Sequence, residues 1–419
     1  MSEVFQYKPS RLTIKINSDS DTSRLKIVFA AGESSYPPIV HPLSEFNQKS
    51  LERELVSVRE KMSTWSKQYD SFLADRDRPL TCDPEKVKKV WKGLADWGRS
   101  IYRDLFDIQG ENNAELIDWS KDLKELKGER IVVDSAIGNI PWGLLYDDVV
   151  PETLEGDYLP ELLSHFWATK YQLEVLPDYP HNRVLWRPDL RNTDSTRFTV
   201  TINKDIKGKY GDAQDTFFDG LAPRLKASVR KPPSTLVVNY DKVDVIDSIT
   251  QRQEPQHLIY FFCHHKKADG GWTLRGYRDF EQTKLIIRGE DPKLESATLS
   301  IKEMKNNEHI KGFSSPPVVF FNACESSQTE IGDPSSFMQY FVKTLKSYAF
   351  IGTEAEIPAA FADEFGKYFV GEFLNAERIG QILFDERREF AKTHCNPFGL
   401  YYTLYGDGNV HLQEPVKEN

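Results

Sequence analysis

The spacing of hydrophobic residues changes twice along the chain. Hydrophobic and polar residues first alternate over residues 11–16 and 24–30, which predicts two strands joined in a hairpin by the turn-rich segment between them. Hydrophobic residues then recur at helical spacing, which predicts long helices over about 44–72, 83–106 and 113–126. Asp83 and Pro84 favour the start of the second helix, because Asp caps helices and Pro fits the first turn.

From Gly128 onward the apolar residues form short continuous runs. These runs predict strands over 130–135, 171–177, 196–203, 234–240, 257–262, 317–322 and 349–353. Helices are predicted over 212–225, from about 242, and over 335–345, 359–374 and 377–392. The charged segment 268–307 is predicted to be an insertion with one strand pair, lying over the carboxyl end of the sheet. Continuous apolar strands that alternate with helices indicate an α/β fold with a mostly parallel sheet covered on both faces.

The length of 419 residues predicts more than one structural unit. We expect an N-terminal hairpin-and-helix module over 1–125, with a regulatory or packing role, and an α/β domain over 126–415. No apolar run is long enough to span a bilayer, and the first residues lack the apolar core of a secretory signal. The net charge of −10 argues against nucleic acid as a direct ligand. Four scattered cysteines favour a reducing, cytoplasmic location without a disulfide framework or a cysteine-built zinc site.

Two of the predicted strands end in side chains that could be reactive. The run "LIYFF" is followed by Cys263, His264 and His265, and the run "VVFFNA" is followed by Cys324. Active sites in proteins with a parallel sheet usually lie beyond the carboxyl ends of the strands. If the two strands are neighbours, an imidazole and a thiol stand side by side, and the imidazole can take the thiol proton to leave a nucleophilic thiolate. Such a pair can hydrolyse an amide bond.

Other interpretations of these residues stay open. A lone cysteine is most often a small buried hydrophobe, and a histidine at a strand end can simply be hydrogen-bonded. Cys263 offers a second thiol, although its place in the strand favours packing. A metal site built from Cys263, His264 and His265 is conceivable, but adjacent residues rarely converge on one ion, and spacing places no fourth ligand. A nucleotide-binding fold has little support, because no Gly-rich phosphate loop follows any strand.

The order of these motifs resembles the CHAT family of caspase-like cysteine peptidases, relatives of caspases and separases. The resemblance covers about residues 129–412 and is carried by "IPWGLLYDD", "YFFCHH", "VFFNACES", "YAFIGTEAEIPAAFADEFGKYF" and "NP…YYTLYGDG". It implies a caspase-like fold with a Cys-His dyad, in which His264 is the general base and Cys324 the nucleophile. It also implies that the backbone N–H groups of His265 and Cys324 hold the oxyanion. The family has Gly where this chain has His265, which puts activity in question.

The resemblance further implies a cytoplasmic cysteine endopeptidase that needs no metal or organic cofactor. Glu354, Glu356 and Asp363 fall near the family's pocket for the residue before the scissile bond, where acidic groups would favour Arg or Lys; a solvated acidic loop is the alternative. The family's bacterial members imply a role in defence or cell death, with a co-encoded, gasdermin-like protein as substrate and an activating protein as a further partner. The alternative function is a catalytically inactive caspase-like scaffold that binds other proteins.

Overall fold

The structure of the chain is a computed structural model that describes part of the sequence. The described residues are 12–19, 24–31, 34–35, 39–41, 45–75, 78, 80–106, 128–135, 140–177, 189–190, 197–202, 235–239, 245–247, 249, 256–266, 284–286, 298–307, 310, 312–313, 315–323 and 337–412. For Cys263 to Lys266 the description covers the backbone alone. Cys324 and the helices predicted over 113–126 and 212–225 lie outside the described residues.

The described strands form one large sheet and a separate short pair. Along the main path of the sheet the order is β12-β11-β10-β13-β14-β15-β6-β5-β1-β2-β3, with β8 between β10 and β9, and β4 beside β2. The strands of the sheet are β1 (Leu12–Asp19), β2 (Arg24–Ala31), β3 (Ser34–Ser35), β4 (Ile39–His41), β5 (Arg130–Ser135), β6 (Gln172–Pro177), β8 (Arg197–Ile202), β9 (Thr235–Asn239), β10 (Leu258–Lys266), β11 (Lys284–Ile286), β12 (Thr298–Ser300), β13 (Val318–Ala323), β14 (Ala349–Thr353) and β15 (Tyr402–Gly406). The separate pair joins β7 (Asp189–Leu190) and β16 (His411–Leu412).

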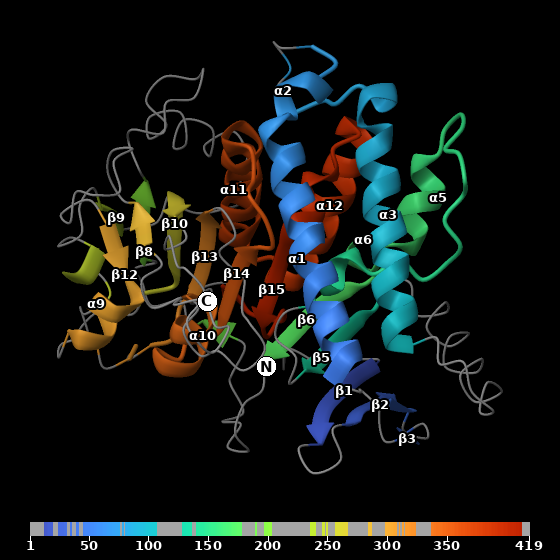
Figure 1. Cartoon of the computed structure of the whole chain (residues 1–419). Helices are drawn as coiled ribbons and strands as arrows, with labels where there is room; N and C mark the ends of the chain where they lie inside the picture. The colour runs from blue at the N-terminus through green and yellow to red at the C-terminus, as the bar shows by residue number, and fades with distance from the viewer. Residues whose placement is uncertain are drawn as a thin grey trace, which may run out of the picture.

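Strand directions divide the sheet into two parallel blocks. Strands β9, β8, β10, β13 and β14 run parallel to one another, and β15 is antiparallel to β14. Strands β6, β5 and β1 then run parallel to β15. Figure 1 shows the two blocks with their arrows in opposite directions. The prediction of a mostly parallel α/β sheet flanked by helices is therefore confirmed.

Helices pack against this sheet, and most begin and end close to the predicted limits. The helices are α1 (Glu45–Lys67), α2 (Tyr69–Phe72), α3 (Pro84–Phe106), α5 (Leu159–His165), α6 (Trp167–Lys170), α9 (Ile301–Asn306), α10 (Phe337–Gln339), α11 (Ala359–Leu374) and α12 (Ile379–His394). Two predicted helices differ from the structure. The first is interrupted at Gln68, and the helix predicted over 335–345 changes to π-helical hydrogen bonding over Tyr340–Thr344. Among the described helices, none is long and apolar enough to cross a bilayer.

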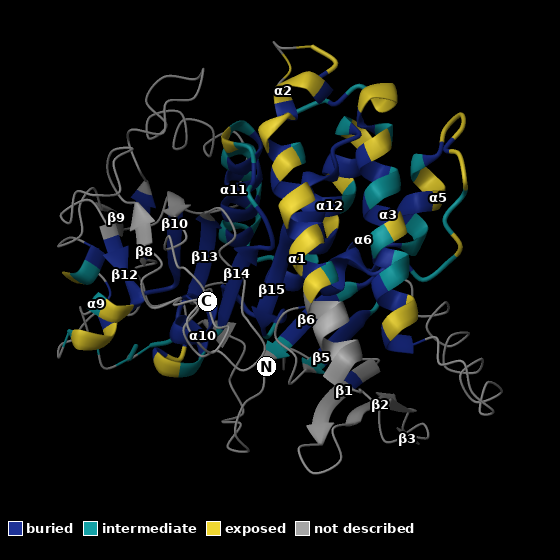
Figure 2. Ribbon diagram, in the orientation of Figure 1, coloured by how far each residue is buried: buried dark blue, intermediate teal, exposed yellow. Residues whose placement is uncertain are grey.

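Residues 258–262 of β10 and 318–322 of β13 are buried on both faces of the sheet, which explains their continuous apolar sequences. Tyr260 and Phe320 contribute to the core on the α11 side, and their rings pack edge to face at 5.3 Å. Phe261 and Phe321 contribute to the opposite core with ring centroids 4.6 Å apart. Figure 2 shows the part of these strands whose burial is described, residues 258–262 and 318–322, as buried. Covering on both faces removes the need for alternating polar residues.

The N-terminal segment joins the same sheet and the same core. β1 pairs antiparallel with β2, as predicted, and also pairs parallel with β5, so that Leu12 is the partner of Ile131. α1 and α3 run side by side, with Trp65 stacked on Trp97 at 5.1 Å, and their outer surfaces are exposed (Figures 1 and 2). The domain boundary predicted at residue 125 falls within 107–127, outside the described residues, and stays a prediction.

Gly98 lets α3 approach the Pro-Trp turn closely. That turn is the 3-10 helix Trp142–Leu144, and a Cβ on Gly98 would lie 1.9 Å from the Leu144 carbonyl oxygen. Gly93 differs, because a Cβ there would meet the ring of Trp65, a side chain that can shift. Helix α3 is thus packed backbone to backbone against the segment that follows β5.

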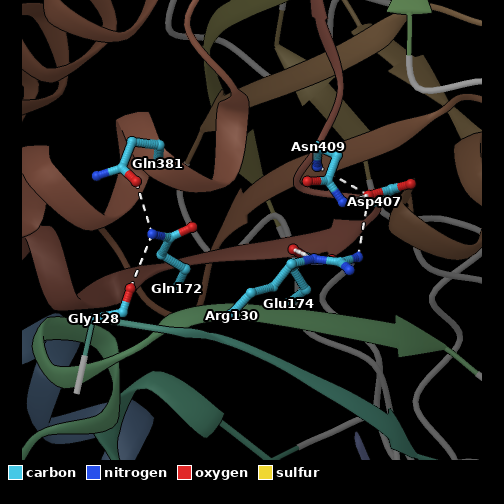
Figure 3. A network of polar contacts seen from close by, with 7 residues as sticks. All are labelled: Gly128, Arg130, Gln172, Glu174, Gln381, Asp407 and Asn409. Carbon is cyan, nitrogen blue, oxygen red and sulfur yellow. Dashed lines mark hydrogen bonds and ion pairs between the residues drawn. The ribbon is translucent and has the colours of Figure 1, made fainter. Parts of the chain in front are cut away.

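A buried polar network fastens β5 and β6 to the turn after β15 (Figure 3). The Arg130 guanidinium donates to both carboxylate oxygens of Glu174 and, at 3.2 Å, to Asp407. Burial raises the pKa of Glu174, although Arg130 opposes that shift. Nearby, the Gln172 side chain donates to the Gln381 oxygen at 2.7 Å and so ties β6 to α12. This network lies among elements that carry none of the predicted catalytic residues.

Candidate functional site

The carboxyl ends of β10 and β13 lie side by side at one edge of the sheet. The two strands are parallel and in register from Leu258 with Val318 to Cys263 with Ala323. His264 is the next residue of β10, and Cys324 is the next residue in the chain after Ala323. Hydrogen-bonded strands lie about 4.8 Å apart, so the two strand ends that carry the predicted dyad are adjacent.

β10 continues further than its apolar sequence predicts. The predicted strand ends at Phe262, whereas β10 extends to Lys266. The extension has a physical cause, because His264 and His265 pair antiparallel with Ile286 and Leu285 of β11, which supplies backbone partners. β11 also pairs with β12, so the strand pair predicted within the insertion is confirmed.

Asn322, two residues before the predicted nucleophile Cys324, connects four elements of the structure. Its side-chain N–H groups donate to the Tyr260 hydroxyl at 2.8 Å and to the Ala362 carbonyl at 2.6 Å. Its oxygen accepts from the Tyr402 hydroxyl at 2.7 Å. Asn322 is 2% exposed, and both amide N–H groups and the amide oxygen are hydrogen-bonded. We call these contacts the Asn322 network; they link β13 with β10, α11 and β15.

Gly366 makes room for the Asn322 network. A Cβ at this position of α11 would lie 2.2 Å from the Tyr260 hydroxyl oxygen and 3.2 Å from the Asn322 amide nitrogen. The ring of Tyr402 stacks on Phe365 with centroids 3.9 Å apart, which fixes the second hydroxyl. The close approach of α11 to the sheet is thus needed for these hydrogen bonds.

Glu354 follows β14 and is buried in an ion pair within the protein. Its carboxylate lies 2.7 Å from the Arg59 guanidinium of α1, with side-chain exposures of 1% and 8%. It also accepts from the hydroxyls of Thr403 at 2.8 Å and Tyr405 at 3.1 Å. A carboxylate with these partners could meet a basic substrate side chain only if Arg59 were displaced. The predicted substrate contact of Glu354 stays a prediction.

Glu356 is held by residues near the end of helix α1. Its carbonyl accepts a hydrogen bond from the Ser66 hydroxyl, and its N–H donates to the Ser63 hydroxyl at 3.5 Å. Its carboxylate lies 3.6 Å from the Lys67 ammonium, in a pair that is 37% and 69% exposed. α1 therefore contacts the segment after β14 both at a buried and at an exposed ion pair.

Asp363 lies in α11, four residues after its first residue Ala359. Its carboxylate accepts from the Lys367 ammonium at 2.5 Å. Lys367 is only 6% exposed and also contacts Glu364 at 3.1 Å. Burial raises the pKa of Asp363, although Lys367 opposes that shift. Of the three acidic residues predicted near the pocket, Glu356 has the most exposed carboxylate.

The two cysteines whose side chains are described belong to the core. Cys82 is 1% exposed and Cys395 is 6% exposed. Burial raises the pKa of both thiols, which disfavours the reactive thiolate. Within the described part of the chain, no group of three His, Cys, Asp or Glu side chains could hold a metal ion.

Sequence reasoning did not single out the polar partners at this edge of the sheet. Asn322, Tyr260, Tyr402 and Arg59 were not predicted to act there. One signal was available for Asn322, because an amide at the end of a buried apolar run must find hydrogen-bond partners. No signal identified Arg59, since its partner lies 295 residues away in the sequence.

Comparison with known proteins gives one sequence relative and distant structural neighbours. No family model matches the chain. The chain is 26% identical over 168 residues to a protein of Vitiosangium sp. (strain GDMCC 1.1324) named a probable protease. That match covers 40% of this chain and 20% of the relative, so the chain spans a fifth of its length. The resemblance to the CHAT family stays a prediction.

The chain also superposes on two crystal structures of the Saccharomyces cerevisiae separase–securin complex. The TM-scores are 0.47 and 0.48, at 11% and 12% identity. Each match covers 96% of this chain and 30% of the separase chain.

Proposed function

We propose that this protein is a cysteine endopeptidase in which Cys324 is the nucleophile and His264 is the general base. The observation that carries the proposal is the register of β10 and β13, which makes Cys263 and Ala323 partners. The next residue in the chain after each of these two is then the histidine or the cysteine of the dyad. The relative named a probable protease, although it matches only part of the chain, supports the same reaction class.

The alternation of side chains along the strands adds support. Leu258, Tyr260 and Phe262 of β10 belong to the core on the α11 side, and so do Val318 and Phe320 of β13. Asn322 contacts α11 directly. The proposal extends the two-residue period by one step, which assigns positions 264 and 324 to this same face. Opposite parity would have assigned the two positions to different faces.

In the proposed reaction, the imidazole of His264 takes the thiol proton of Cys324. The thiolate attacks the scissile carbonyl carbon, and the carbonyl oxygen becomes an oxyanion. The imidazolium then gives its proton to the departing amine as the carbon–nitrogen bond breaks. Water, deprotonated by the imidazole, attacks the thioester and releases the acid and the free thiol. This chain supplies every proton-transfer group in these steps.

The backbone N–H groups of Cys324 and His265 are the proposed oxyanion donors. Successive N–H groups along a strand point to alternate sides, so one of His264 and His265 donates toward β11 and the other toward the β13 side. The proposed oxyanion role requires that the His265 N–H is the one that points toward the β13 side. A histidine in place of glycine retains this N–H and is strained only at positive φ.

The substrate is proposed to be a protein with Arg or Lys before the scissile bond. Glu356 is the best-placed of the three acidic candidates, because its carboxylate is 37% exposed and its pair with Lys67 is loose. Glu354 would contribute only after release of Arg59, and Asp363 only in competition with Lys367. A bacterial defence or cell-death role with a co-encoded gasdermin-like substrate rests on the CHAT resemblance and belongs to the proposal.

The decisive experiment combines substitution with thiol labelling. Cleavage of fluorogenic tetrapeptides and of casein should be abolished by Cys324→Ala, while Cys263→Ala, the matched control one residue before His264, should retain it. His264→Gln should lower kcat at least a hundredfold, and His265→Gln much less. Iodoacetamide should label Cys324 faster than the other three cysteines. Cleavage that survives Cys324→Ala would falsify the proposal.

The alternative function is an inactive caspase-like scaffold. It predicts that all four cysteines react slowly with iodoacetamide and that no peptide of the library is cleaved. Circular dichroism of Cys324→Ala should match the parent protein in either case, so that loss of cleavage is assigned to chemistry and not to unfolding.

A further inference from the structure

A buried amide at the end of β13 is connected to three other elements next to the proposed catalytic residues. Asn322 is the partner of Phe262 in the strand ladder, and it precedes Cys324 by two residues. Its side chain uses both N–H groups and its oxygen, on Tyr260, Ala362 and Tyr402. The proposed mechanism assigns no step to these contacts.

The three hydrogen bonds of the Asn322 side chain fix the position and orientation of the end of β13. Tyr260 belongs to β10, the strand that carries His264, so one hydrogen bond ties the histidine strand directly to the cysteine strand. The bond to the Ala362 carbonyl fixes the distance to α11, and the bond from Tyr402 fixes the side toward β15. A residue two positions along the chain is at most about 7 Å from this anchored point.

We propose that Asn322 is a positioning residue, which holds the backbone before Cys324 so that the thiol meets the imidazole of His264. This inference rests on the proposed function. Loss of the amide removes three hydrogen bonds from a buried site, and the strand end can then rotate or shift. A displacement of about 1 Å at a reacting atom is enough to slow catalysis substantially.

The chemistry of the amide makes the proposal specific. An aspartate of the same shape accepts from both tyrosines but cannot donate to the Ala362 carbonyl, and its charge is buried. Asn322→Asp should therefore be as damaging as Asn322→Ala. Tyr402→Phe removes a single hydroxyl and retains the ring stacked on Phe365, so the variant keeps its packing.

Asn396 provides a matched control whose hydrogen-bond partners lie outside the Asn322 network. Its side chain is 1% exposed and donates to the Tyr69 hydroxyl at 2.9 Å and to the Leu80 carbonyl at 2.8 Å. Asn396→Ala thus removes the same kinds of hydrogen bond from the same kind of environment. Tyr69→Phe is the corresponding control for Tyr402→Phe.

The test measures kcat, KM and the rate of iodoacetamide labelling at Cys324 in the full-length chain. We expect Asn322→Ala to lower kcat and the labelling rate at least tenfold, with KM within twofold of the parent value. Tyr402→Phe should lower both rates about threefold to tenfold. Asn396→Ala and Tyr69→Phe should lower the melting temperature to a similar extent but leave kcat and labelling within twofold.

Two outcomes overturn the inference in distinguishable ways. If Cys324→Ala abolishes cleavage but Asn322→Ala and Tyr402→Phe behave like their controls, Asn322 is only structural and the proposed function stands. If cleavage persists in Cys324→Ala, the proposed function fails and this inference fails with it. Should Asn322→Ala not fold, the comparison of Tyr402→Phe with Tyr69→Phe decides.

Discussion

The ion pair between Arg59 and Glu354 should couple the N-terminal helix to the sheet energetically. The pair is 2.7 Å long and almost fully buried, and Glu354 accepts two further hydrogen bonds. We consider the variants Arg59→Met and Glu354→Gln and the double variant. Removing one partner leaves the other charge buried, which costs about 3–5 kcal/mol of unfolding free energy.

The double variant should be much more stable than the two single effects suggest. With both charges gone, methionine fills the space of the arginine stem, and the glutamine amide still accepts from the two hydroxyls. Each single variant should lose about 3–5 kcal/mol and the double variant no more than one of them, which gives a coupling of at least about 3 kcal/mol. Urea unfolding followed by the fluorescence of the eight tryptophans measures these values.

Helix α1 and the segment after β14 also form an exposed ion pair, which serves as a matched control. Lys67 and Glu356 are 3.6 Å apart and are 69% and 37% exposed, so the corresponding cycle with Lys67→Met and Glu356→Gln should give a coupling below about 0.5 kcal/mol. Equal couplings for the buried and the exposed pair would refute the reasoning, because burial would then make no difference. A buried coupling near zero would equally show that α1 is not held by this contact.

Three further predictions concern packing, titration and thiol reactivity. Gly98→Ala should destabilise the protein by about 3 kcal/mol, because its Cβ meets a backbone carbonyl, whereas Gly93→Ala meets a side chain and should cost less than 1.5, as measured by urea unfolding. Burial lowers the pKa of His394, so the unfolded chain binds this proton more tightly and stability should fall as pH drops below about 6.5; His394→Gln should flatten that part of the profile of melting temperature against pH. Mass spectrometry after brief iodoacetamide treatment at pH 7.5 should find Cys82 and Cys395 unmodified, and rapid labelling of either would contradict their burial.

The two long N-terminal helices contact the rest of the protein at two places. α1 holds the segment after β14 through Arg59, Ser63, Ser66 and Lys67, and α3 packs directly on the Pro-Trp turn through Gly98. Both helices share core with the strands that end at the candidate site. Deleting residues 1–106 should therefore expose core residues and yield insoluble protein, instead of a free peptidase domain.

Local patterns predicted most of the described helices and strands. The helix Ala359–Leu374 and the strand Ala349–Thr353 were predicted at their observed limits, and the helix Pro84–Phe106 to within one residue, because apolar spacing acts within the element itself. The end of β10 was predicted too early at Phe262. Its continuation to Lys266 depends on β11, a strand that is more than fifteen residues away in the sequence.

The features of the candidate site likewise divide into those that local sequence predicts and those that depend on tertiary packing. The sequence by itself determined that a histidine and a cysteine follow two long apolar strands, since a buried strand is recognisable from its own residues. Only the tertiary structure decided that these strands are parallel neighbours with Cys263 opposite Ala323. It also decided that Glu354 pairs with Arg59 and that Asn322 contacts Tyr260, Ala362 and Tyr402. Such pairings join positions separated by 40 to 295 residues, and their choice depends on how whole elements pack, which no local pattern encodes.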